Sequence, residues 1–135
     1  MKKTNLVLLV IFLLPIVVLG IFFANAKPQV FSALSLVEAK AKAVEQEKIL
    51  LVDATADWCQ PCKAMERTTW VDPEVIAWIN LNAIAIQVDV DRQREEAKEL
   101  KIQAMPTIIV FKDGRELDRV VGYQDAEELL AWLNR

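Results

Sequence analysis

Residues 50–63 read LLVDATADWCQPCK, and the architecture of the whole chain can be inferred outward from them. Residues 48–55 predict a buried strand, because they are continuously apolar from Ile49 to Val52. Residues 63–69 predict a helix. The two cysteines of the chain, Cys59 and Cys62, stand at the junction between these elements. A Cys-x-x-Cys pair between a strand and a helix N-terminus is the arrangement of a dithiol redox site.

The positions of the two cysteines predict different roles for them. Residues three apart in a helix lie on neighbouring turns of one face, so the two sulfurs are close enough to bond. Cys59 lies at the helix N-terminus, where free backbone N–H groups and the macrodipole favour a thiolate, and we expect it to be the attacking thiol. Cys62 lies one turn further, and we expect it to be more buried and to act as the resolving thiol. Pro61 fits the first turn, where its missing N–H costs nothing.

Composition argues against several other kinds of site. The chain has 135 residues, enough for one domain, and no histidine, so the usual general base and the commonest metal ligand are missing. Two cysteines are too few for a zinc site, and a disulfide across two residues closes too small a loop to stabilise much. We therefore expect neither a metal nor a bound cofactor. The net charge of −3, without a basic cluster, argues against nucleic acid as a partner.

Residues 1–26 predict either a signal peptide or a membrane anchor. Lys2 and Lys3 precede an uncharged run at 6–24, which as a helix would be about 28 Å long, close to the roughly 30 Å hydrocarbon core of a bilayer. This length favours a retained anchor, whereas the small-x-small triplet Ala-Asn-Ala at 24–26 favours cleavage. Both interpretations place the rest of the chain outside the cytoplasm, because the positive end stays inside.

The rest of the chain predicts a linker at 27–34, with a brief strand around 29–31, and one domain at 35–135. Helix caps are expected at Ser35, Asp72 and Asp125, and Asp113-Gly114 predicts a two-residue hairpin. The expected helices are 35–47, 63–69, 72–80, 93–101 and one that begins at Asp125, and the expected strands are 48–55, 83–90, 107–111 and 116–121. This order implies a layered α/β domain with parallel strands first and an antiparallel pair last.

From about residue 33 to residue 135 the chain resembles the thioredoxin family. The residues that carry the resemblance are Asp53 six positions before Cys59, Trp58-Cys-x-Pro-Cys-Lys63, Met105-Pro106-Thr107 before an apolar strand, and Gly122 after the hairpin. Within the family it is most similar to the C-terminal thioredoxin-like domain of the membrane electron transporter DsbD, through residues 56–59, Glu66 and residues 72–75. It departs from the family at Arg67, where a proline is usual, and at Gln87, where a lysine is common.

The resemblance implies a thioredoxin-like fold, with a central mixed sheet flanked by helices, here preceded by one N-terminal hydrophobic helix. It also implies a cis peptide bond at Pro106, packed against the disulfide, that leaves the Met105 backbone free to pair with an extended substrate. A proline at the start of a strand needs no function, so this role depends on the resemblance alone. We assign substrate contacts to Trp58, Pro61, Met105 and Pro106.

Asp53 is a polar residue in an otherwise apolar strand. Burial would raise the pKa of its carboxyl group and make it a proton acceptor for Cys62 during thiol exchange. The alternative is a strand-end aspartate that forms a local hydrogen bond. Successive side chains of the expected strand at 83–90 point to opposite faces, and Gln87 is on the face from which it could reach Asp53. Its neutral amide could donate a hydrogen bond to the carboxyl group of Asp53, but it carries no charge that would lower the pKa of that group.

These features predict an extracytoplasmic thiol–disulfide oxidoreductase that reduces protein disulfides. It would lie at the periplasmic side of a bacterial inner membrane, or free in the periplasm if the N-terminal segment is cleaved. Its partners would be disulfide-containing proteins and a membrane thiol electron donor, because reduction in an oxidising compartment needs a supply of electrons. The alternatives are a disulfide oxidase or isomerase, and a non-catalytic module that binds extended peptides.

Overall fold

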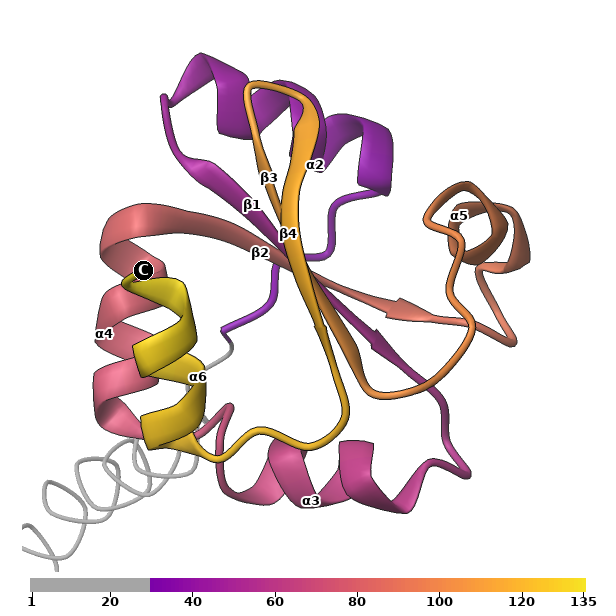
Figure 1. The fold of residues 1–135 in the computed structure, drawn as a ribbon. Coiled ribbons are helices and arrows are strands. Elements are labelled where there is room, and N and C mark those ends of the chain that lie inside the picture. Colours follow the sequence, from indigo (N-terminus) through magenta and orange to yellow (C-terminus); the bar gives the residue numbers. More distant parts are fainter. Residues whose placement is uncertain (1–29) are drawn as a thin grey trace, which may run out of the picture.

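A mixed four-stranded sheet with the strand order β2-β1-β3-β4 lies at the centre of the structure (Figure 1). The structure is a computed structural model that describes residues 30–135. The signal peptide or anchor expected at 1–26 lies outside the described residues. Within residues 30–135, no helix is long and apolar enough to cross a bilayer.

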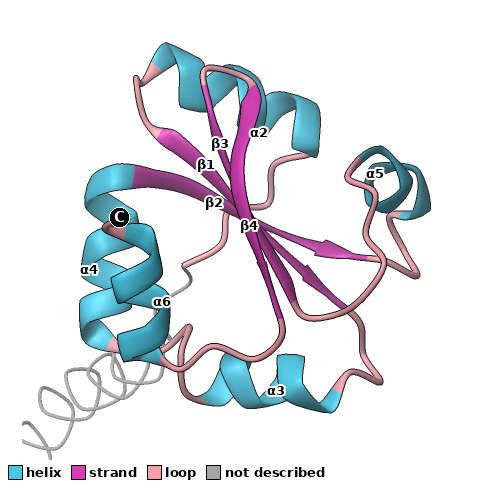
Figure 2. Cartoon of the chain, in the orientation of Figure 1, coloured by secondary structure: helices cyan, strands magenta, loops and turns pink. Residues whose placement is uncertain are grey.

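The order of helices and strands agrees with the order expected from the sequence (Figure 2). The strands are β1 Ile49–Thr55, β2 Ala83–Asp89, β3 Thr107–Lys112 and β4 Arg115–Val121, and the helices are α2 Leu36–Glu45, α3 Gln60–Arg67, α4 Pro73–Asn82, α5 Arg94–Glu99 and α6 Ala126–Leu133. β1 pairs in parallel with β2 and antiparallel with β3, and β3 pairs antiparallel with β4. The prediction of parallel strands first and an antiparallel pair last is therefore confirmed.

Each face of the sheet packs against its own set of helices, because successive side chains of a strand point to opposite faces. On one face, Leu51 of β1 packs with buried residues of α3, α4 and α6, among them Met65 and Leu129. On the other face, Leu50 and Val52 pack against α2, and we call this second set of residues the α2-side core (Leu36, Ala39, Ala43, Leu50, Val52, Ile86, Val88, Leu100, Ile109, Phe111). Asp53 is two residues after Leu51 in β1, so the two side chains point to the same face of the sheet, which is the face covered by α3.

The expected caps and the expected hairpin are present. The Ser35 and Asp125 side chains accept hydrogen bonds from the third backbone N–H of α2 and α6, and Asp72 caps α4. Asp113 and Gly114 both have positive φ, 51° and 75°, as a tight two-residue turn between β3 and β4 requires.

α3 ends at Arg67 with Thr68 as its C-cap residue, in agreement with the end expected near Thr68–Thr69. Trp70 follows it and is buried, with its ring edge-on to Phe31 at 5.1 Å between centroids. The structure differs from the expectation near residue 30. The brief strand expected around 29–31 is absent from residues 30 and 31, which contact the core through their side chains. The link to the sheet is instead the backbone N–H of Ser32, which donates to the Ala85 carbonyl at 2.8 Å.

Candidate functional site

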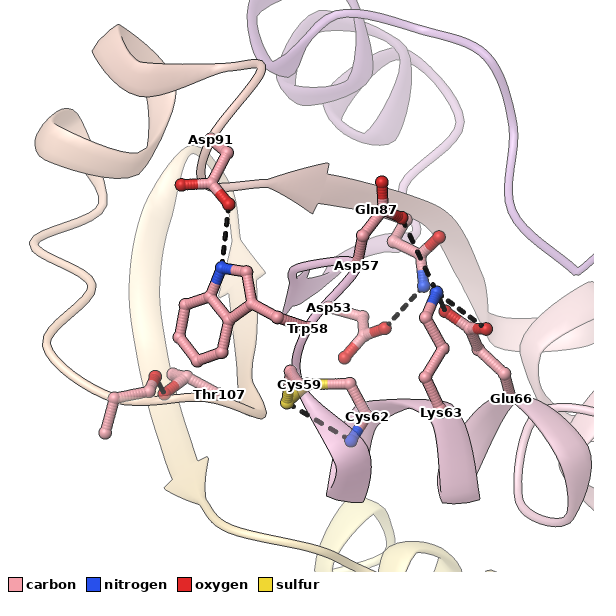
Figure 3. The surroundings of a disulfide bond; sticks show 11 residues. Asp53, Asp57, Trp58, Cys59, Cys62, Lys63, Glu66, Gln87, Asp91 and Thr107 are labelled. Atoms are coloured by element: carbon pink, nitrogen blue, oxygen red, sulfur yellow. Dashed lines mark hydrogen bonds and ion pairs between the residues drawn. A yellow bond between two sulfur atoms is a disulfide. The ribbon is translucent and has the colours of Figure 1, made fainter.

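Cys59 and Cys62 form a disulfide between the end of β1 and the first turn of α3 (Figure 3). Cys59 is the N-cap residue of α3, and its sulfur accepts a hydrogen bond from the Cys62 backbone N–H at 3.3 Å. The helix thus begins at Gln60, earlier than expected, and Pro61 is in its first turn as expected. Backbone N–H groups at a helix N-terminus stabilise negative charge, so a thiolate at Cys59 would be favoured.

The difference in exposure expected between the two cysteines is very small. Cys59 is 4% exposed and Cys62 is 2% exposed, and both belong to a small buried cluster with Ala56, against which Val90 and Met105 pack. Exposure alone therefore does not single out the attacking sulfur. The N-cap position of Cys59 does, since only that sulfur lies at the end of the helix.

Asp53 lies on β1 near the disulfide (Figure 3) and is 2% exposed. Its Oδ2 accepts a hydrogen bond from Gln87 Nε2 of the neighbouring strand at 2.9 Å, while Oδ1 has no hydrogen-bond partner among residues 30–135. Burial raises the pKa of the Asp53 carboxyl group from 3.8 to about 7, against the lowering effect of the Gln87 hydrogen bond. The charge of Glu66 adds to the rise, and the Trp70 indole opposes it. The expected burial and the expected Gln87 contact are both confirmed.

The four residues assigned to substrate contacts are not equally close to the sulfurs. Met105 packs against the disulfide, and the Met105–Pro106 peptide bond is cis, as the resemblance implied. Pro106 is buried, and its carbonyl accepts from the Gly122 N–H at 2.8 Å. Trp58 is 65% exposed beside Cys59, and Pro61 is exposed on α3.

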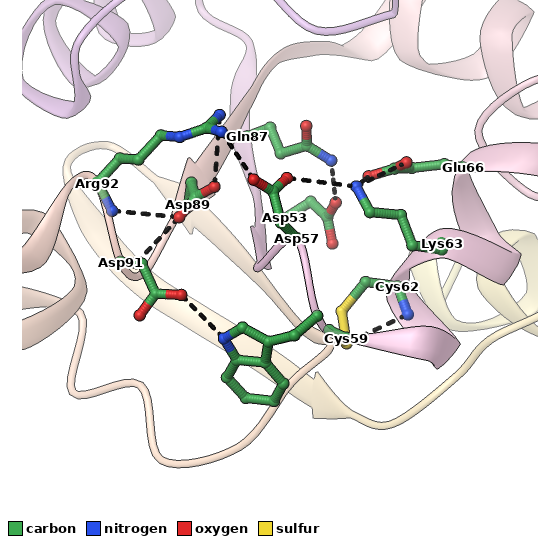
Figure 4. A network of polar contacts seen from close by, with 11 residues as sticks. Asp53, Asp57, Cys59, Cys62, Lys63, Glu66, Gln87, Asp89, Asp91 and Arg92 are labelled. Carbon is green, nitrogen blue, oxygen red and sulfur yellow. Dashed lines mark hydrogen bonds and ion pairs between the residues drawn. A yellow bond between two sulfur atoms is a disulfide. The ribbon is translucent and has the colours of Figure 1, made fainter.

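A polar network beside the disulfide was missed by the sequence analysis (Figure 4). The Trp58 indole N–H donates to Asp91 Oδ2 at 2.8 Å, and Arg92 donates to Asp57 at 2.7 Å. Lys63 lies between Glu66, at 3.0 Å, and Asp57, at 3.8 Å. One signal for these contacts was available: β1 and β2 are parallel neighbours, so the residues that follow each strand meet at the same edge of the sheet.

The described residues contain no group of three or more Asp, Glu, Cys or His side chains placed to hold a metal ion. The chemistry that the site offers is that of its two sulfurs. A buried disulfide at a helix N-terminus, above a carboxyl group whose pKa lies near neutrality, can exchange with external thiols while the carboxyl group takes up or releases a proton.

Comparison with known proteins identifies the class. Residues 36–135 match the family described as "Thioredoxin-like domain", and the chain therefore belongs to the thioredoxin family. Within that family it is related to the thiol:disulfide interchange protein DsbD of Haemophilus ducreyi, with 34% identity over 111 residues. That match covers 77% of this chain and 19% of the DsbD protein.

Two plant thioredoxins are also similar to it. Thioredoxin H-type 1 of Nicotiana tabacum is 40% identical over 88 residues, which are 64% of this chain and 65% of the relative. The crystal structure of a thioredoxin from Nicotiana alata superposes with a TM-score of 0.60 at 31% identity, covering 76% of this chain and 85% of that one. The chain thus spans less than two thirds of the length of the tobacco protein and about a fifth of the length of DsbD.

Proposed function

We propose that this protein is an extracytoplasmic thiol–disulfide oxidoreductase that reduces disulfides in other proteins. The observation that carries the proposal is the Cys59–Cys62 disulfide at the N-terminus of α3, with the buried Asp53 near it on β1 (Figure 3). Membership of the thioredoxin family and the relation to DsbD support it.

The reaction begins from the reduced dithiol. The Cys59 thiolate attacks one sulfur of a partner disulfide, the partner S–S bond breaks, and its second sulfur leaves as a thiolate that takes up a proton. Cys62 then loses its proton to Asp53 and attacks the Cys59 sulfur. The mixed disulfide breaks, the second partner sulfur leaves as a thiolate that takes up the proton held by Asp53, and the 59–62 disulfide forms. The partner gains two electrons from the dithiol and two protons: one comes from Cys62 by way of Asp53, and the other comes from the solvent, which received the Cys59 proton when the thiolate formed.

Asp53 is suited to the proton step. A carboxyl group with a pKa of about 7 is partly ionised at neutral pH, so it can accept a proton from Cys62 and return it in the reverse direction. Gln87 holds the carboxylate by a hydrogen bond without neutralising its charge.

The reducing direction and the location rest on the sequence. No histidine stands between the cysteines to stabilise the thiolate further and make the disulfide strongly oxidising. The apolar run at 6–24 after Lys2 and Lys3 supports export across a bacterial inner membrane, either as an anchor or as a cleaved signal. A membrane thiol electron donor would then return the 59–62 disulfide to its reduced form.

The test is the equilibrium of the Cys59–Cys62 pair against glutathione buffers of known ratio. We expect a midpoint below about −200 mV, towards the roughly −270 mV of thioredoxin, for a reductase. A midpoint near −120 mV would contradict this direction and indicate an oxidase.

A second measurement separates catalysis from peptide binding. Replacing both Cys59 and Cys62 with serine should abolish the acceleration by the protein of the reduction of insulin disulfides by dithiothreitol, and leave only the uncatalysed rate. If the wild-type protein shows no turnover and both forms bind an extended peptide equally well, the protein is a binding module.

A further inference from the structure

The side chain of Met105 carries a third sulfur atom next to the redox pair. Met105 packs against the small buried cluster that Cys59 and Cys62 form with Ala56, and it is half-buried, so solvent reaches it. The other methionine in the part of the chain that the structure describes is Met65 on α3, which is completely buried in the core. The two thioethers therefore differ in access, because a small solute can reach Met105 and cannot reach Met65.

The backbone on both sides of Met105 is held in place. Thr107 Oγ1 donates to the Ala104 carbonyl at 2.7 Å, and the Pro106 carbonyl accepts from the Gly122 N–H at 2.8 Å. Thr107 is buried and begins β3, so the segment is tied to the sheet. Met105 therefore stays beside the disulfide, and a group added to its sulfur would have to lie there too.

The reactivity of this sulfur-containing site depends on the state of the two cysteines. In the dithiol form the Cys59 thiolate is the better target for a peroxide, and its sulfenic acid condenses with Cys62 to the disulfide. In the disulfide form neither cysteine has a thiolate. The thioether of Met105 is then the accessible sulfur for an oxidant to attack, because a thioether reacts without having to lose a proton.

We propose that Met105 is a modification site at which hydrogen peroxide converts the thioether to a sulfoxide and thereby lowers the activity of the protein towards disulfide partners. The O–O bond of the peroxide breaks, one oxygen atom bonds to the methionine sulfur, and the other leaves as water. The sulfur loses two electrons and the peroxide gains them. The inference rests on the proposed function, because its consequence concerns the turnover of protein disulfides.

The sulfoxide changes the surface that a partner meets. A thioether is a flexible apolar group, whereas a sulfoxide is polar and carries an oxygen that accepts hydrogen bonds. A partner disulfide attacked by Cys59 must come close to the cluster against which Met105 packs, and the partner would remove water from this oxygen without replacing the lost hydrogen bond. Oxidation of Met105 should therefore weaken the approach of a partner while the 59–62 disulfide itself stays intact. A methionine sulfoxide reductase would restore the thioether, so the change is reversible.

The test treats the whole chain in its disulfide form with hydrogen peroxide, removes the peroxide, and locates added oxygen by mass spectrometry of peptides. We expect one added oxygen atom at Met105 and an unmodified Met65. After the treatment, kcat/KM for insulin, with dithiothreitol as the electron source, should fall about tenfold, the effect of desolvating one polar group without a new hydrogen bond. Incubation with the two methionine sulfoxide reductases, one for each sulfoxide epimer, should restore both the peptide mass and kcat/KM.

Met105→Leu and Met65→Leu form a matched pair of variants, because leucine is similar to methionine in volume and has no sulfur to oxidise. Each variant is compared with its own untreated sample, so a difference in starting activity does not affect the result. We expect peroxide to leave kcat/KM of Met105→Leu unchanged and to lower kcat/KM of Met65→Leu about tenfold, as in the wild type.

Three outcomes would overturn the inference while the proposed function stands. They are peptides in which Met105 gains no more oxygen than Met65, full activity of a protein whose Met105 is completely oxidised, and an equal loss of activity after peroxide treatment in Met105→Leu. An untreated wild-type protein that does not turn over insulin would contradict the proposed function itself. The expected loss of activity would fail with it, whereas the peptide masses test the modification in either case.

Discussion

Replacing Asp53 with asparagine should change how the stability of the oxidised protein depends on pH. In the folded protein the pKa of Asp53 is about 7, and its ordinary value is 3.8. Below pH 3.8 the Asp53 carboxyl group is protonated in both the folded and the unfolded protein, so it does not make the free energy of unfolding depend on pH. As the pH rises from 3.8 to about 7, the unfolded chain releases the proton while the folded protein keeps it, so the folded protein loses stability. Above pH 7 both states are ionised, and the loss is complete.

The size of the loss follows from the shift of the pKa. Each unit corresponds to about 1.36 kcal/mol, so the difference between 3.8 and about 7 destabilises the folded protein by about 4 kcal/mol at pH 8. Asparagine keeps an acceptor for Gln87 Nε2 and does not titrate. The difference in the free energy of unfolding, Asp53→Asn minus wild type, should therefore increase by about 4 kcal/mol between pH 4 and pH 8.

Urea unfolding at several pH values, with the 59–62 disulfide intact in both proteins, measures this difference. Contributions from the other carboxyl groups cancel between the two proteins. Asp57→Asn is the matched control, because it removes a carboxylate that is 67% exposed, and its difference from wild type should vary by less than about 1 kcal/mol over the same range. If Asp53→Asn behaves like this control, Asp53 does not titrate with a raised pKa, and its assignment as the proton acceptor for Cys62 is refuted.

Three further outcomes are expected. Cys62→Ser should accumulate a mixed disulfide at Cys59 with a partner protein, visible by mass spectrometry, and the same adduct in Cys59→Ser would reverse the assigned roles. Gln87→Lys should lower the pKa of Asp53, because a cation beside a carboxylate favours the charged form, so the pH-dependent loss of stability should become smaller and end at lower pH; a larger loss would show that the lysine turns away. Asp125→Ala removes the N-cap of α6 and should cost about 1 kcal/mol in urea unfolding; an unchanged midpoint would mean that the cap contributes nothing.

Much of the fold could be predicted because its signals are local in the sequence. The caps at Ser35 and Asp125 and the hairpin at 113–114 depend on neighbours a few residues away, and all are present in the structure. The contact between Trp70 and Phe31 could not be predicted in this way. It joins two residues 39 positions apart in the chain, and no local pattern specifies such a contact.

The site was predictable in its chemistry and less so in its surroundings. Cys59, Cys62 and Asp53 stand out by residue type and spacing, and the Gln87 contact follows from strand alternation. The bond between Trp58 and Asp91 joins residues 33 positions apart and depends on the direction of two exposed side chains, which an amino-acid pattern does not specify. The nearly equal burial of the two cysteines was also beyond a local pattern, since Val90 and Met105, from other parts of the chain, pack against the cluster that they form with Ala56.

The division of the sheet into two separately packed faces has a practical consequence for labelling this protein. Asp53, Gln87 and α3 all lie on one face, whereas the α2-side core fills the other. Val37, on the outer surface of α2, is 72% exposed and belongs to neither core. A fluorophore or an affinity handle carried by a residue that replaces Val37 and reacts without thiols would lie on the other side of the sheet from α3, so surface-immobilised protein should keep its redox site accessible to partners in solution.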